Sequence, residues 1–126
     1  MTTTKPVREG FSTVTPYLIV PDADKLIDFV KQTFGATELS RTTGSAGGTH
    51  AEVRIGDSMI MIGGSAKSAS MPIMLYIYMR DVDSIYKRAL EAGATSIMEP
   101  AAQDDGERRA GVKDTFGNQW YIGEPL

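Results

Sequence analysis

The chain has 126 residues, 41% of them hydrophobic, and a net charge of −3, which fits a single globular domain and argues against a nucleic-acid partner. It contains no cysteine, which excludes disulfides, thiolate metal sites and cysteine nucleophiles. No apolar run reaches membrane-spanning length and the polar start lacks a secretory apolar core, so we expect a cytoplasmic protein without a membrane partner.

The first part of the chain predicts an arm, a strand and a helix. Residues 1–10 are polar and should have little structure of their own. An apolar strand is expected over 13–20, and Asp22 or Asp24 can cap the following helix. Gly35 suits a left-handed helix end. The helix has one apolar stripe, formed by Leu26, Ile27, Val30 and Phe34.

Three more strands are expected before the middle of the chain. They cover 36–41, 49–55 and 59–62, with a flexible loop at 44–48 and a turn at Gly56-Asp57. The second of these strands alternates with a period of two residues, which predicts two different faces. One face carries Ala51, Val53 and Ile55, and the other carries His50, Glu52 and Arg54.

The second half repeats this order after a Gly-, Ser- and Ala-rich linker at 63–72. A strand at 74–79 precedes a helix that Asp81 or Asp83 can cap and that ends at Gly93. The remaining expected elements are a strand at 95–98, a loop at 99–106 and a hairpin of strands 109–113 and 119–122 across the turn 114–118. The triplet Gly-Ala-Thr occurs in both halves, at 35–37 and 93–95.

The repeat predicts one α+β domain over residues 1–126, made of two βαβββ modules at about 11–62 and 73–124. Side by side, their sheets would form a curved, partly open, barrel-like mixed sheet. The helices would cover the convex face because each has a single apolar stripe to bury. The concave face would then hold a ligand among the polar residues of the strands.

Several motifs resemble one protein family. They are Thr15-Pro16-Tyr17-Leu18, Phe34-Gly35-Ala36, the run from His50 to Ser58, Gly106-Glu107-Arg108 and the run from Asp114 to Trp120. In this order and spacing they resemble the vicinal oxygen chelate superfamily of glyoxalase I, bleomycin-resistance proteins and extradiol dioxygenases, and within it the PhnB-like branch. The resemblance implies the duplicated fold, while the superfamily supports several chemistries as well as pure binding.

The resemblance also implies where a metal would be held. Enzymes of the superfamily hold a divalent metal through His, Gln or Glu from the first and last strands of each module. On this chain the four positions are Thr15, Ile60 or Met61, Met74 and Tyr121. Hydroxyl and thioether groups are poor ligands for Fe, Mn, Ni or Zn. We therefore predict no metal and no other cofactor.

Three polar residues are candidates for contact with a ligand. His50 is the only histidine and would be the acid–base group near neutral pH, oriented by Glu52; alternatively the two form a structural hydrogen bond. Arg108 could clamp a carboxylate or phosphate, or be a solvated loop arginine.

Aromatic residues supply the other candidates. Tyr76, Tyr78 and Trp120, together with several methionines, could line a deformable pocket for flat apolar ligands. The same residues could pack the core or a dimer contact instead. The methionines are Met59, Met61 and Met74.

We predict a small-molecule-binding protein like the sequestering or resistance-type members of this superfamily, and the resemblance implies that it acts as a homodimer. One alternative is a lyase, isomerase or dioxygenase that uses a divalent metal or acid–base chemistry on His50. Another is a dimeric scaffold or regulator whose concave face is filled by its own side chains.

Overall fold

The computed structural model describes residues 6–44 and 47–126, so the predicted arm at 1–10 and the loop at 44–48 lie partly outside the described residues. The chain runs twice through strand, helix and three strands. The elements are β1 (Tyr17–Ile19), α1 (Ala23–Phe34), β2 (Thr37–Thr43), β3 (Thr49–Ile55), β4 (Ser58–Gly64), β5 (Met74–Tyr78), α2 (Val82–Glu91), β6 (Thr95–Ala102), β7 (Glu107–Lys113) and β8 (Gln119–Pro125).

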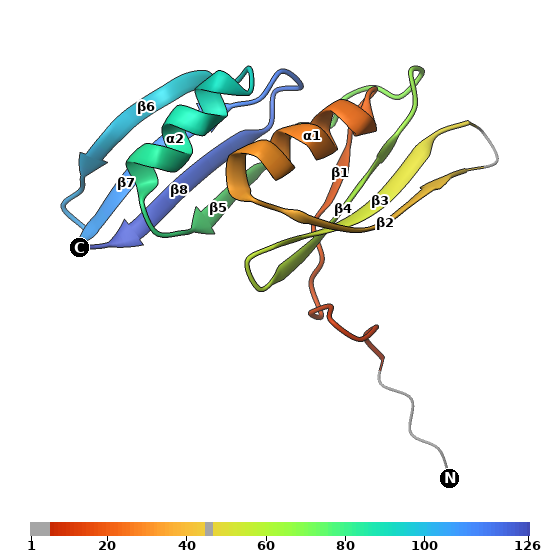
Figure 1. Ribbon diagram of the computed structural model, residues 1–126, viewed down its shortest axis with the longest axis horizontal. Helices are drawn as coiled ribbons and strands as arrows, with labels where there is room; N and C mark the ends of the chain where they lie inside the picture. The colour runs from red at the N-terminus through yellow and green to blue at the C-terminus, as the bar shows by residue number, and fades with distance from the viewer. Residues whose placement is uncertain (1–5, 45–46) are drawn as a thin grey trace, which may run out of the picture.

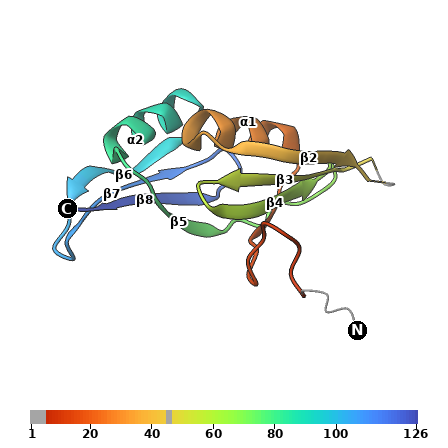
Figure 2. The same cartoon turned by 60° about the horizontal axis from the view of Figure 1, so that its bottom comes forward.

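The strands form two mixed sheets of four, which lie side by side (Figure 1). Their orders are β1-β4-β3-β2 and β5-β8-β7-β6. In each sheet the first strand is parallel to the last strand of its module, and the other pairs are antiparallel. Both helices lie on the same side of the sheets (Figure 2). The predicted α+β fold of two βαβββ modules is confirmed.

Local sequence signals determine where the helices begin and end. Asp22 caps α1 by accepting a hydrogen bond from the backbone N–H of Lys25 at 3.1 Å, and Gly35 ends it with a φ of 66°. Asp81 caps α2 by accepting a hydrogen bond from the backbone N–H of Ser84 at 3.3 Å. Asp81 has a left-handed backbone conformation, with a φ of 63°, which Asp adopts more readily than most residues.

Several predicted strand boundaries were wrong; in the last hairpin, β7 begins at Glu107 rather than at 109 and β8 ends at Pro125 rather than at 122. The first strand starts at Tyr17 rather than at residue 13, after Pro16, which has no N–H to donate to a neighbouring strand. The expected loop at 99–106 is too long, because β6 continues through Pro100 to Ala102. Pro100 is tolerated because β6 is an edge strand and its register with β7 is irregular at this point.

The core lies between the helices and the sheets, and Trp120 joins the two modules within it. This side chain is fully buried, with its ring centroid 5.2 Å from that of Phe34 and 6.2 Å from that of Phe29, both on α1. Its indole N–H donates to Asp114 at 2.9 Å. Helix α1 also packs against α2. One module therefore buries its helix partly against the last strand of the other.

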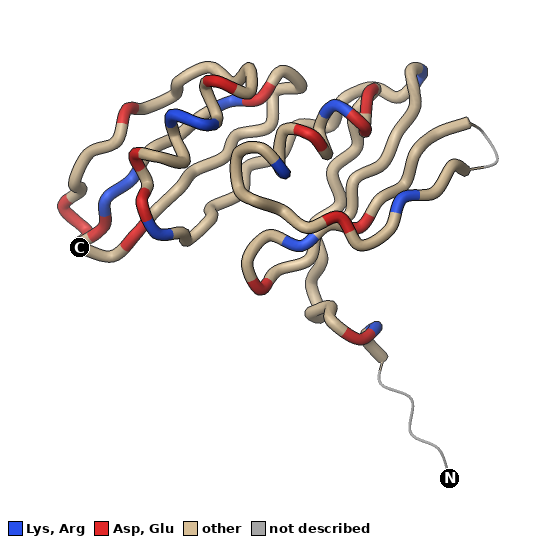
Figure 3. The backbone as a smooth tube through the Cα atoms, viewed as in Figure 1, with Lys and Arg blue, Asp and Glu red and all other residues tan. Residues whose placement is uncertain are grey.

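Charged residues of both signs are interspersed along the described chain, and Lys and Arg do not gather in one segment (Figure 3). Neither α1 nor α2, the helices in the described part of the chain, is long and apolar enough to cross a membrane.

Candidate functional site

The sides of the two sheets that face away from α1 and α2 form the open face. It is made by the alternate residues of each strand that do not enter the core. On β3, Ala51 and Val53 enter the core, while His50 lies on the open face. Residues 6–16 also lie on this side of the molecule (Figure 2).

In the first module, a tyrosine reaches across a glycine to a histidine. Tyr17 on β1 lies over Gly63 on β4, so closely that a Cβ at Gly63 would be 2.6 Å from the phenol oxygen. Gly63 pairs with His50 on β3. The Tyr17 hydroxyl is 3.0 Å from His50 Nδ1. Gly63 therefore provides the room that lets the two side chains meet.

The second module repeats this arrangement with an arginine in place of the histidine. Tyr76 on β5 lies over Gly123 on β8, where a Cβ would be 2.2 Å from the phenol oxygen. Gly123 pairs with Arg109 on β7, whose Nε donates to the Tyr76 oxygen at 3.0 Å. We call these two arrangements the tyrosine bridges. The sequence contains a signal for them, since the Tyr-to-Tyr, His-to-Arg and Gly-to-Gly spacings are all 59 or 60 residues, although the pattern of apolar residues does not reveal it.

Further tyrosines extend the aromatic surface of the second sheet. Tyr121 lies over Gly111, with its ring 2.8 Å from the place of a Cβ. Tyr78 is 64% exposed and its ring centroid is 5.1 Å from that of Tyr76. A cavity of about 380 Å³ is lined by Tyr78, Gly123 and neighbouring residues. A second one, of about 200 Å³, lies between β5 and the β3–β4 turn and is lined by Tyr76 and Tyr78.

Charged groups surround Tyr76. Its hydroxyl donates to Glu107 at 2.5 Å, and partial burial together with this hydrogen bond raises the pKa of Tyr76. A hydrogen bond with Glu107 likewise raises the pKa of Tyr78. The hydroxyls of Tyr76 and Tyr78 in turn lower the pKa of Glu107. Arg109 also pairs with Asp105, so the cluster of two carboxylates and one guanidinium is anionic at neutral pH.

Glu52 is bound by Arg8 rather than by His50. The His50 Nε2 is 3.9 Å from a Glu52 oxygen, too far for a hydrogen bond. Arg8 instead donates to both carboxylate oxygens, and the Ser40 hydroxyl donates to one of them at 3.3 Å. The hydrogen bond from Arg8 is the main reason why the pKa of Glu52 is lowered. The alternative of a structural His–Glu hydrogen bond is therefore not realised.

Two of the six predicted ligand-binding residues do not lie on the open face. Arg108 donates through Nε and Nη2 to both carboxylate oxygens of Asp83 on α2, at 2.7 and 2.9 Å. Trp120 is buried in the core. Along β7 and β8, side chains alternate between the core and the open face, and both residues point to the core side. Their neighbours Arg109 and Tyr121 therefore lie on the open face instead. The other four predicted residues, His50, Glu52, Tyr76 and Tyr78, lie on the open face.

Comparison with known proteins identifies the family. Residues 10–122 match the Glyoxalase/Bleomycin resistance protein/Dioxygenase superfamily. The chain belongs to this superfamily. An uncharacterized protein of Mycobacterium bovis is 34% identical to it, over 90% of this chain and 83% of the relative.

Solved structures of other proteins share the fold. TioX from Micromonospora sp. ML1 has a TM-score of 0.75 at 24% identity, covering 91% of this chain and 99% of TioX. Glyoxalase I from Zea mays has a TM-score of 0.70 at 18% identity, covering 87% of this chain and 45% of the maize protein. At these identities the likeness shows the fold alone. Membership of the PhnB-like branch stays a prediction.

The resemblance implied a metal at Thr15, Ile60 or Met61, Met74 and Tyr121. In the observed register, however, Tyr17 rather than Thr15 lies opposite Met61, and Tyr76 rather than Met74 lies opposite Tyr121. These two pairs lie on the open face, and Ile60 lies in the core. Phenol and thioether groups are weak ligands for divalent transition metals at neutral pH. Within residues 6–44 and 47–126, no three or more His, Cys, Asp or Glu side chains lie together where they could hold a metal ion.

Proposed function

We propose that this superfamily member binds a flat organic molecule on the open face, in the manner of a sequestering protein. The tyrosine surface of the second sheet carries this proposal. Tyr76 and Tyr121 each lie across a glycine, so the surface is aromatic and has few projecting side chains. Aromatic faces bind flat rings by offset stacking. The cavity of about 380 Å³ beside Tyr78 provides space of the size that small ligands need.

We propose that binding does not involve a metal. The support is the donor chemistry of Tyr17, Met61, Tyr76 and Tyr121 at the paired strand positions. The ligand would be held by ring stacking and by hydrogen bonds to the Glu107–Arg109 pair. Elemental analysis of the purified protein should find far less than one transition metal per chain, and a value near one would contradict this part of the proposal.

One observation favours an enzymatic alternative. Tyr17 and His50 form a hydrogen-bonded pair at 3.0 Å, and the His50 side chain is 36% exposed. A histidine within reach of a phenol and close to a carboxylate can transfer a proton to or from a bound molecule. If the protein is an enzyme, His50→Ala should abolish turnover while Arg88→Ala, on α2, leaves it unchanged.

We also propose that the protein is a homodimer. The second sheet and the segment before it expose large apolar side chains, since Met71, Met74 and Tyr78 are each more than 60% exposed. Such a surface is typical of a binding or subunit contact. A second copy would cover part of it and would close the cavities that the single chain leaves open.

The test combines native mass spectrometry with a neutral flat probe, 2-naphthol. Native spectra report the subunit count and any molecule that copurifies. Tyr76→Ala should weaken 2-naphthol binding about 2- to 12-fold, the loss expected for one stacking contact. Leu39→Ala is the control, since Leu39 is 47% exposed against 40% for Tyr76 and lies on the first sheet. Equal binding by both variants and the wild type would refute the proposal.

A further inference from the structure

Glu52 is a nearly buried carboxylate on a face that is otherwise open. Its side chain is 8% exposed. It lies on β3 beside Met61 of β4. Burying a carboxylate is costly unless it is paired with a cation. The cation here is Arg8, with help from the Ser40 hydroxyl.

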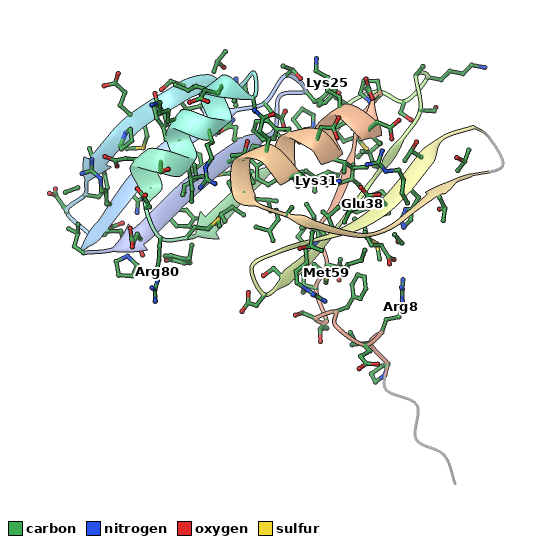
Figure 4. The ribbon with its side chains drawn as sticks, viewed as in Figure 1. Arg8, Lys25, Lys31, Glu38, Met59 and Arg80 are labelled. Carbon is green, nitrogen blue, oxygen red and sulfur yellow. The ribbon has the colours of Figure 1, made fainter. Side chains whose placement is uncertain are left out.

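The cation comes from a segment that the sheets hold only loosely. Met61 N–H donates to the carbonyl of Pro16 at 2.9 Å, but no backbone hydrogen bond joins residues 6–15 to a strand or helix of the described chain. Figure 4 shows Arg8 extending from this segment toward the first sheet. The Arg8 side chain is 67% exposed and lies 4.8 Å above the ring of Phe11 in the same segment. The segment thus presents a guanidinium together with an aromatic ring.

The second module has no carboxylate at the corresponding strand position. The residue of the second module that corresponds to Glu52 is Gly111, as the pairing of Glu52 with Met61 and of Gly111 with Tyr121 shows. There the position is covered by the Tyr121 ring and carries no charge. The same strand position is therefore closed in one module by packing and in the other by an ion pair with a loosely held segment.

We infer that Glu52 is the receptor for a guanidinium or ammonium group of the ligand, and that Arg8 occupies this receptor until the ligand displaces it. The inference rests on the proposed function, that the open face binds a small molecule. His50 lies 3.9 Å from Glu52 and contacts Tyr17 on its other side. Tyr17 is 46% exposed, so its ring offers a cation–π contact to a positively charged ligand. The Arg8 and Phe11 side chains supply this same chemistry from within the chain.

The test measures how phenylguanidine and its neutral analogue phenylurea bind to full-length variants by calorimetry. If Arg8 occupies the site in most molecules, the apparent affinity for a ligand falls in proportion to the fraction of molecules whose site is free. Arg8→Ala should therefore bind phenylguanidine about tenfold or more tightly than the wild type. Adding Glu52→Gln should remove the gain. Phenylurea affinity should change by less than about twofold in all variants, because the site selects the charge. Arg88→Ala on α2 is the control for the lost positive charge and should match the wild type.

A second measurement uses the wild-type protein, so it does not depend on whether variants without the Arg8–Glu52 ion pair fold. In the wild-type protein, the Arg8 Nε–H resonance should shift when phenylguanidine is added and stay in place with phenylurea. Equal affinity of Arg8→Ala and wild type, or a gain that survives Glu52→Gln, would overturn the inference. If 2-naphthol still binds in a Tyr76-dependent way, the proposed function survives that result. If neither probe binds, the proposed function fails as well.

Discussion

Removing the Asp114 carboxylate is expected to destabilise the protein strongly. This buried side chain accepts four hydrogen bonds: from the N–H groups of Phe116 and Asn118, from the Asn118 side chain and from the Trp120 indole, at 2.8 to 3.0 Å. Asp114→Ala would leave the two side-chain donors buried without a partner, at roughly 1–3 kcal/mol each, and would weaken the turn. We expect a loss of about 4 kcal/mol, a large part of the 5–15 kcal/mol that typically stabilises a domain.

A milder substitution tests whether the hydrogen bonds are the cause. In Asp114→Asn one oxygen can still accept from the two backbone N–H groups, while the new amide cannot accept from Asn118 and Trp120. We expect a loss of about 3 kcal/mol, because the two side-chain donors lose their acceptor while the turn keeps its backbone hydrogen bonds. Asp57→Ala is the control, because Asp57 is an exposed turn residue and such positions change stability by about 0.5 kcal/mol or less.

The assay is urea unfolding followed by tryptophan fluorescence and circular dichroism. Trp120 is the only tryptophan, so its fluorescence reports on the site itself, where α1 of one module packs on β8 of the other. A loss below about 1 kcal/mol for Asp114→Ala, or equal stability of Asp114→Asn and wild type, would refute the reasoning.

Two further predictions concern the second sheet and the first helix. Gly123→Ala should displace the Tyr76 ring, because the new Cβ would be 2.2 Å from its oxygen. The loss of partial burial and of the Glu107 contact should then lower the pKa of Tyr76, and an ultraviolet titration identical to the wild type would contradict this. Lys31 and Glu38 lie together between α1 and β2 (Figure 4), and the hydrogen bonds from Arg41 and Lys31 lower the pKa of Glu38 from 4.5 to about 2. The carboxylate thus stabilises the fold above pH 4.5 and ceases to do so as the pH falls toward 2. Glu38→Gln should therefore cost about 1 kcal/mol at neutral pH and almost nothing at pH 2, whereas an equal cost at both would argue against the ion pairs.

The sequence by itself determined the elements and their repetition. Helix caps such as Asp22, the left-handed end at Gly35 and the alternation along β3 depend on residues close together in the chain, so local rules predict them. The duplicated fold followed because each half showed the same order. The alternation also put His50 and Glu52 on one face, where the structure finds them.

Only the tertiary structure decided what these residues touch. The Tyr17–His50 contact depends on the register of three strands and on Gly63 lying between them, and Glu52 meets Arg8 across 44 residues of chain. A shift of one residue in register exchanges the two faces of a strand. Trp120, a predicted cavity residue, occupies a core position of its strand and faces the helices instead. Arg108, expected in a loop, lies on β7 and also faces the helices. Pairings of this kind are decided by the packing of distant segments, which spacing along one chain does not encode.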